Sequence, residues 1–153
     1  MPEPDAQSPQ TRLTLRSRLE DLALVVPWLD TLTAKYAIPG DTRFRIDLCL
    51  EEAISNIVRH GYGGQPDHAI TIDFSIDVRT GLTFTVVDNA PHFAPNEQAE
   101  PVPAPQTLED VTPGGLGIQL MEKFATTLRY EQLPDGNRLT LGFDLAPSKP
   151  ADA

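Results

Sequence analysis

The stretch that decides the fold reads Glu52-Ala53-Ile54-Ser55-Asn56, near the middle of a chain of 153 residues. In an α-helix, positions i and i+4 lie on the same face, so Glu52 and Asn56 stand side by side. Ser55 and Arg59 share their polar face. The opposite face carries an apolar stripe wide enough to pack against a sheet, formed by Ile46, Leu50, Ala53, Ile54 and Ile57. The sequence therefore predicts a helix with one packed face and one face available for chemistry.

The polar pair on this helix suggests two chemical roles. The side-chain oxygen of Asn56 can bind a hard cation such as Mg²⁺, which prefers oxygen ligands and keeps waters beside substrate phosphates. Glu52 would then act as a general base near that metal. A Glu-x-x-x-Asn pair is also common on ordinary solvated helix faces, so this spacing alone leaves that alternative open.

A second informative stretch reads Gly114-Gly115-Leu116-Gly117-Ile118 and precedes apolar residues at helical spacing, Leu120, Met121 and Phe124. Glycine lets the backbone approach a ligand closely, and a helix N-terminus offers unpaired N–H groups to an anion. The pattern predicts a phosphate cradle, with a flexible loop as the alternative. It is not a Walker loop, because no Lys-Ser or Lys-Thr follows.

Between these stretches, Phe84 to Val87 alternate like a strand that ends at Asp88 and continues into Asn89-Ala90-Pro91. A buried carboxylate at a strand end can accept a hydrogen bond from an exocyclic amine such as that of adenine. The three elements, in this order, predict a nucleotide site.

The same three stretches resemble the sequence boxes of the GHKL ATPase/kinase superfamily. Residues 52–62 resemble its N box, residues 88–95 its G1 box, and residues 114–117 its G2 box. Within the superfamily the chain is most similar to the small bacterial anti-sigma factor serine/threonine kinases, and the ending from Leu128 to Leu141 resembles theirs too. The resemblance covers roughly Thr11 to Leu145.

The resemblance implies ATP and Mg²⁺ as cofactors and assigns roles to single residues. Asn56 would bind the metal, Glu52 would be the catalytic base, and Asp88 would contact the adenine. The expected cofactor-binding residues are Asn56, Asp88, Ala90, Gly114, Gly115, Leu116 and Gly117. Ala90 departs from the family, which usually has glycine there. Its methyl group disfavours positive φ and puts the shape of the loop and the nucleotide affinity in question.

Periodicity along the chain predicts an α+β protein with the element order βαα-ββ-α-ββ. We expect a two-layer α/β sandwich, in which helices cover one face of a mixed, mostly antiparallel sheet; the Bergerat fold that the resemblance implies agrees with this. Pro27 would kink the first helix or mark its start, and Asp41 would cap the second, which runs to about His60. One domain is expected over residues 11–145, with disordered tails at 1–10 and 146–153.

Composition excludes several classes of protein. A net charge of −10 leaves no basic footprint, so direct nucleic-acid binding is not expected. The single cysteine, Cys49, excludes an internal disulfide, and we expect it to lie in the core. Trp28 is also expected in the core, with a dimer surface as the alternative. The absence of a bilayer-length apolar run and of a signal peptide leads us to expect a soluble, cytoplasmic protein without a membrane segment.

Residues 96–113 form a long proline-rich, acidic segment at the place of the ATP lid, with an insertion without a role as the alternative. The three histidines, His60, His68 and His92, are not spaced as metal ligands.

Two functions follow from these features. The first is an ATP-dependent serine/threonine protein kinase that acts as an anti-sigma factor; it would sequester a sigma factor and phosphorylate an anti-sigma-factor antagonist. The second is a non-catalytic GHKL binding module, which Ala90 favours and the retention of Glu52 and Asn56 disfavours. The catalytic half of a sensor histidine kinase is a weaker third, because no histidine precedes His60. A homodimer is left open.

Overall fold

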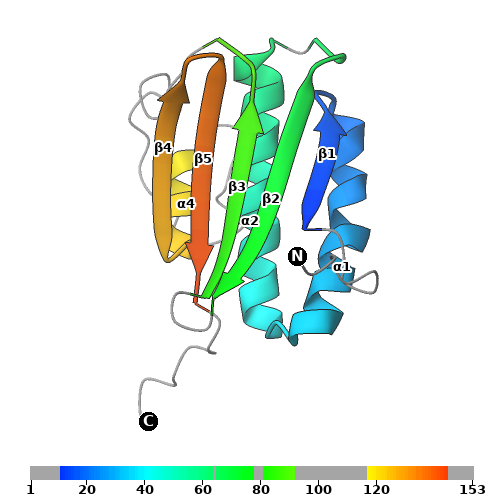
Figure 1. Cartoon of the computed structure of the whole chain (residues 1–153), viewed down its shortest axis with the longest axis vertical. Coiled ribbons are helices and arrows are strands. Elements are labelled where there is room, and N and C mark those ends of the chain that lie inside the picture. Colours follow the sequence, from blue (N-terminus) through cyan, green and yellow to red (C-terminus); the bar gives the residue numbers. More distant parts are fainter. Residues whose placement is uncertain (1–10, 64, 78–80, 92–116, 145–153) are drawn as a thin grey trace, which may run out of the picture.

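The computed structural model describes residues 11–63, 65–77, 81–91 and 117–144. Its elements follow the predicted order βαα-ββ-α-ββ (Figure 1). They are β1 (Arg12–Arg16), the 3₁₀ helix η1 (Leu19–Leu24), α1 (Val25–Tyr36), α2 (Gly40–Asn56), the π-helical turn η2 (Ile57–Gly61), β2 (Ala69–Asp77), β3 (Gly81–Asp88), α4 (Gly117–Phe124), β4 (Thr127–Leu133) and β5 (Gly136–Phe143).

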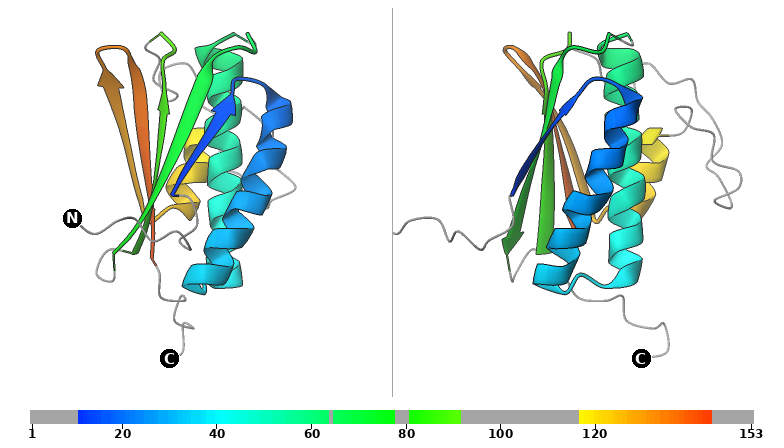
Figure 2. Two further views of the ribbon diagram at one scale, coloured as in Figure 1. Left: turned by 45° about the vertical axis from the view of Figure 1, so that its right-hand side comes forward. Right: turned by 90° about the vertical axis from the view of Figure 1, so that its right-hand side faces the viewer.

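The five strands form one sheet in the order β1-β2-β3-β5-β4, and each of the four pairings is antiparallel. The helices α1, α2 and α4 lie together on one face of this sheet (Figure 2). The predicted two-layer α+β architecture is therefore confirmed. The expected mixture of directions is not found in the described strands, because each strand there runs opposite to its neighbours.

The core lies between the sheet and α2. The apolar stripe predicted on α2 is buried, with Ile46, Leu50 and Ile54 fully inaccessible. Phe84 of β3 stands at the centre and makes an edge-on contact with Trp28, whose ring centroid lies 6.0 Å away. Cys49 and Trp28 both belong to this core, as expected. Burial of this stripe is what fixes the rotation of α2 and hence the direction of its polar side chains.

The helix starts differ from the sequence expectation in one case. Pro27 is the third residue of α1, where its missing N–H would have no intrahelical partner, so it marks the start of that helix. The prediction that Asp41 caps α2 is wrong, because extended Pro39 holds the N-cap position and Gly40 is already helical. Asp41 lies in the first turn, where its carboxylate is still favourable beside the positive end of the helix dipole.

The end of α2 is pinned to the sheet by Tyr62. After the π-helical turn, the Tyr62 N–H donates to the carbonyl of Ile57 at 2.9 Å. The buried Tyr62 hydroxyl donates to the carbonyl of Ala69 at 3.0 Å and accepts from the N–H of Asn89 at 2.7 Å. One side chain therefore ties the helix end to the start of β2 and to the segment that follows β3.

Gly136 is required where β5 begins, and we expect Gly136→Ala to destabilise the fold. A Cβ atom at this position would lie 1.8 Å from the backbone carbonyl oxygen of Asp88, so the backbone of β3 or β5 must shift. The free energy of unfolding, measured by urea denaturation, should fall by about 1–3 kcal/mol or more. Gly40→Ala is the control, because a Cβ there meets nothing within 4 Å; helix propensity should raise stability by up to about 1 kcal/mol. Equal stabilities of the parent and Gly136→Ala would contradict this account.

Candidate nucleotide site

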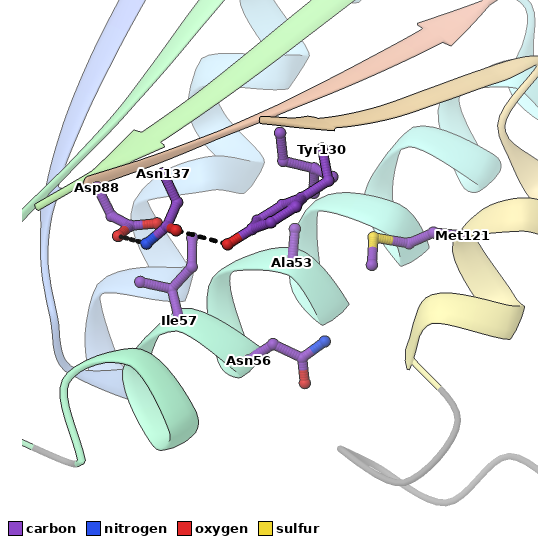
Figure 3. A pocket seen from close by; sticks show the side chains of 8 residues that line it. Ala53, Asn56, Ile57, Asp88, Met121, Tyr130 and Asn137 are labelled. Carbon is purple, nitrogen blue, oxygen red and sulfur yellow. Dashed lines mark hydrogen bonds between the residues drawn. The ribbon is translucent and has the colours of Figure 1, made fainter. Parts of the chain in front are cut away.

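A pocket lies at one end of the sheet, where α2, α4, β3, β4 and β5 meet (Figure 3). Its walls are mostly apolar, with a few polar groups, which is the usual composition of a small-molecule site. The lining residues are Ala53, Asn56, Ile57, Asp88, Met121, Tyr130, Asn137 and Leu139. Two of the sequence-predicted residues, Asn56 and Asp88, are thus brought to one pocket although they lie on a helix and a strand.

Asp88 lies at the end of β3 and is only 3% exposed. Its Oδ1 accepts two hydrogen bonds, from the backbone N–H of Ala90 at 2.8 Å and from Nδ2 of Asn137 at 2.9 Å. Burial raises the pKa of Asp88 above its usual range, while the bonds from Asn137 and Ala90 act in the opposite direction. One carboxylate oxygen is therefore engaged with the protein, and Oδ2 remains as the further acceptor of the group.

Asn137 is a buried polar residue of the site that the sequence did not reveal. It is 2% exposed and stands directly opposite Asp88 in the pairing of β3 with β5. Its Nδ2 also lies 3.2 Å from the carbonyl oxygen of Ala90, and its Oδ1 accepts a hydrogen bond from the Tyr130 hydroxyl. A polar residue just inside a hairpin strand, at a position that should face the core, is the signal that could have pointed to it.

Ala90 does not take a positive φ. Among the described residues other than glycine, only Ala37 has a positive φ, at 52°. Ala90 is 2% exposed and belongs to the hydrophobic core, while its N–H holds Asp88. The expected conflict between an alanine side chain and a positive φ therefore does not arise here.

Glu52 and Asn56 are both buried, at 8% and 6% exposure, and so is Ser55. The alternative of an ordinary solvated helix face does not hold for these three residues. Arg59, which was placed on the same polar face, is exposed. Figure 3 shows the carboxamide of Asn56 turned away from Asp88, toward the side of α4. Glu52 lies one turn earlier on α2 and is not among the pocket-lining residues.

Several residues that the sequence singled out lie outside the part of the chain that the structure describes. Gly114, Gly115 and Leu116 lie outside the described residues, as do His92, the proposed lid at 96–113, the turn residues Arg79 and Thr80, and the two tails. Gly117 is the first residue of α4, as the helix prediction required.

The remaining chemistry-bearing side chains lie away from the pocket. His60 is exposed, and His68 stacks on the ring of Tyr62 at a centroid distance of 4.5 Å. Burial raises the pKa of the Cys49 thiol to about 12, so the thiol stays protonated and unreactive. In the described ranges, no group of three or more His, Cys, Asp or Glu side chains could hold a metal ion.

Comparison with known proteins places the chain in a family. The chain belongs to the histidine kinase-like ATPase domain family, whose model matches residues 15–143. The resemblance to the GHKL superfamily is thereby confirmed.

No helix within the described ranges is long and apolar enough to cross a membrane.

Two relatives are similar in sequence over much of this chain. A protein of Bordetella bronchiseptica named serine/threonine-protein kinase BtrW is 31% identical over 121 residues, which cover 78% of this chain and 83% of that protein. The anti-sigma F factor of Halalkalibacterium halodurans is 30% identical over 94 residues, which cover 61% of this chain and 63% of that protein.

A solved structure shares the fold. The crystal structure of the RsbU and RsbW domains of Rv1364c from Mycobacterium tuberculosis has a TM-score of 0.63 at 16% identity. The match covers 88% of this chain but only 31% of that longer chain. At this identity the likeness concerns the fold alone.

The buried charge of Asp88 leads to a prediction about stability. The folded-state pKa of Asp88 is raised, so the stability associated with its protonated form is present at low pH and is lost as the pH rises through that pKa. Asp88→Asn keeps an oxygen that can accept from Ala90 and Asn137 but removes the charge. We expect the free energy of unfolding of Asp88→Asn to equal that of the parent near pH 3 and to exceed it at pH 7.

Urea denaturation at a series of pH values measures this difference. Asp73→Asn serves as the control, because Asp73 pairs with Arg12 on the surface. A parent that is more stable than Asp88→Asn at pH 7 would show that the charge is stabilised within the fold.

Proposed function

We propose that the protein is an ATP-dependent serine/threonine protein kinase that also acts as an anti-sigma factor. The observation that carries this proposal is the buried Asp88 acceptor in an apolar pocket beside Asn56, on a chain of the histidine kinase-like ATPase family. The name of the Bordetella relative supports kinase activity, and the name of the Halalkalibacterium relative supports the anti-sigma role.

The lining of the pocket matches the chemistry of adenine, and the cavity, about 20 Å³ in this structure, must widen to admit the ring. Ala53, Ile57 and Met121 offer apolar walls for the faces of a purine. Asp88, with Oδ1 engaged by two N–H donors, would use Oδ2 to accept a hydrogen bond from the exocyclic amine. Ala90 would then lie close to the base and hold Asp88 through its backbone.

The phosphates would extend toward Asn56 and the start of α4. Asn56 would hold Mg²⁺ through its amide oxygen, and bound Mg²⁺ would neutralise charge on the phosphates. The resemblance implies that Gly115 and Gly117 bracket the phosphates, with Gly114 and Leu116 also among the cofactor-binding residues. Glu52, one turn before Asn56, would accept the proton of the attacking serine or threonine hydroxyl. The γ-phosphoryl group passes to that oxygen, and ADP leaves.

The proposed partners are a sigma factor, which the protein would sequester, and an anti-sigma-factor antagonist, whose serine or threonine it would phosphorylate. Phosphorylation would stop the antagonist from releasing the sigma factor. A net charge of −10 would suit a basic face on a protein partner and disfavours direct contact with nucleic acid.

We further propose one domain over residues 11–145, a cytoplasmic location alongside the sigma factor, and a homodimer.

The second candidate is a binding module in which nucleotide is structural or absent. Ala90 was the feature in its favour, and the absence of a positive φ at Ala90 removes one part of that support. Incubation of the protein and its antagonist with labelled ATP and Mg²⁺ distinguishes the two functions, because only a kinase labels the antagonist.

Asn56→Ala is expected to abolish Mg²⁺-dependent ATP binding, because it removes the oxygen ligand on this side of the pocket. Isothermal titration calorimetry with ATP, with and without Mg²⁺, measures the effect on protein whose circular dichroism stays native. Asn56→Asp keeps an oxygen ligand and should retain the Mg²⁺ dependence. An Asn56→Ala variant with the parental affinity for Mg²⁺-ATP would remove the metal role.

Glu52→Gln should leave ATP binding nearly intact and slow phosphoryl transfer by about 10²-fold or more, the usual loss when a general base is removed. Glutamine keeps the size of the side chain but cannot take the proton. The matched control is Glu51→Gln, since Glu51 is the exposed neighbour on the same helix. The readout is the single-turnover rate with saturating ATP and antagonist. A parental rate in Glu52→Gln together with a slow Glu51→Gln would reassign the base to Glu51.

A further inference from the structure

Tyr130 reaches the pocket from β4, an edge strand of the sheet, and is one of the lining residues. Its hydroxyl points at Asn137 (Figure 3) and is hydrogen-bonded to Oδ1 of that residue. A carboxamide oxygen can only accept, so the hydroxyl must donate its proton. The direction of this hydrogen bond is therefore fixed.

The fixed direction has a consequence for Asn137. With Oδ1 held by Tyr130, Nδ2 faces Oδ1 of Asp88 at 2.9 Å and the carbonyl oxygens of Ala90 and Pro91 at 3.2 and 3.4 Å. A flipped carboxamide would place an oxygen against three acceptors and an N–H group against the hydroxyl. Tyr130 on one side and the three acceptors on the other thus select one orientation of Asn137.

This orientation determines which groups the protein offers to a ligand. Both N–H groups of Asn137 are directed at Asp88 and at backbone carbonyls, and the proton of Tyr130 is directed at Asn137. The cluster therefore presents acceptors at this corner of the pocket, chiefly Oδ2 of Asp88. A purine with an amino group at C6 fits such a corner, whereas the carbonyl oxygen of a 6-oxopurine meets another acceptor.

We propose that Tyr130 is a specificity-determining residue, which positions Asn137 so that the pocket selects a 6-aminopurine over a 6-oxopurine nucleotide. The inference rests on the proposed ATP-binding function and adds a residue that acts on the base through Asn137. Without the Tyr130 hydroxyl, Asn137 keeps a buried oxygen and loses its donor. One of the two restraints on the carboxamide is then lost, so the flipped orientation, which turns an N–H group away from Asp88 and toward the base, becomes more populated.

The test compares the parent with Tyr130→Phe, which keeps the ring and removes only the hydroxyl. Affinities for ATP and GTP, each with Mg²⁺, are measured by isothermal titration calorimetry. We expect ATP to bind about 10-fold more weakly to Tyr130→Phe, and the preference for ATP over GTP to fall by about 10-fold or more, in the range expected when a buried polar group loses its partner.

Tyr36→Phe is the matched control, because Tyr36 packs on Phe74 in a part of the fold that does not line the pocket. It should leave both affinities unchanged. A merely structural role of Tyr130 would lower both affinities together and leave their ratio unchanged, which would overturn the inference. If Tyr130→Phe binds ATP with an unchanged ratio of ATP to GTP affinity, the role of Tyr130 is wrong and the proposed function stands. If the parent protein binds no ATP, both the proposed function and the role of Tyr130 are wrong.

A second measurement needs no nucleotide. The side-chain amide protons of Asn137, followed by NMR in the nucleotide-free protein, should shift and exchange faster with water in Tyr130→Phe than in the parent. An Asn137 signal that is identical in both would show that Tyr130 does not orient the carboxamide.

Discussion

The pairing of Asp88 with Asn137 across β3 and β5 is the contact on which the pocket depends. It brings a carboxylate into a site that is almost closed to water, and two N–H donors compensate in part for the water it loses. The contact requires the two strands to approach closely, and this is possible because Gly136, next to Asn137, has no side chain. The register of β3 with β5, their close approach at Gly136 and the pairing of Asp88 with Asn137 therefore depend on one another.

The helix α2 links the core to the chemistry. Its apolar stripe packs on the sheet, and this packing sets the direction of the face of α2 that carries Glu52 and Asn56. Tyr62 adds a second restraint at the end of the helix, by hydrogen bonds to β2 and to the segment after β3. The side chains proposed to act on the two ends of a nucleotide, Asp88 and Asn56, therefore belong to elements that are tied together.

The sequence predicted those features that depend on local periodicity. The order of elements, the buried stripe of α2 and the end of β3 at Asp88 all follow from the spacing of apolar residues over a few turns or a short strand. The joint position of Asn56 and Asp88 came from the resemblance to a family. The assignment of Asp41 as a cap failed because the conformation of one residue, Gly40, decides where a helix begins.

Asn137 and Tyr130 could not be predicted in the same way. Their roles depend on which residue of β5 stands opposite Asp88, and that register is set by two strands whose paired residues are 49 positions apart in sequence. The solvated-face alternative for Glu52 and Asn56 failed for a related reason, because their burial comes from parts of the chain beyond their own helix. Tertiary contacts decide both the partner of Asp88 and the burial of Glu52 and Asn56. The spacing of apolar residues within one helix or strand carries no information about such contacts.

The buried Asp88 also links occupancy of the pocket to survival of the folded chain. The carboxylate accepts hydrogen bonds from neutral N–H groups and has a pKa raised by burial, so its charge is a cost to the fold at neutral pH. A ligand that donates to Oδ2 offsets this cost, and any ligand that binds only the folded state slows loss of protein through unfolding and proteolysis. The cellular abundance of the chain would then rise and fall with the supply of its nucleotide.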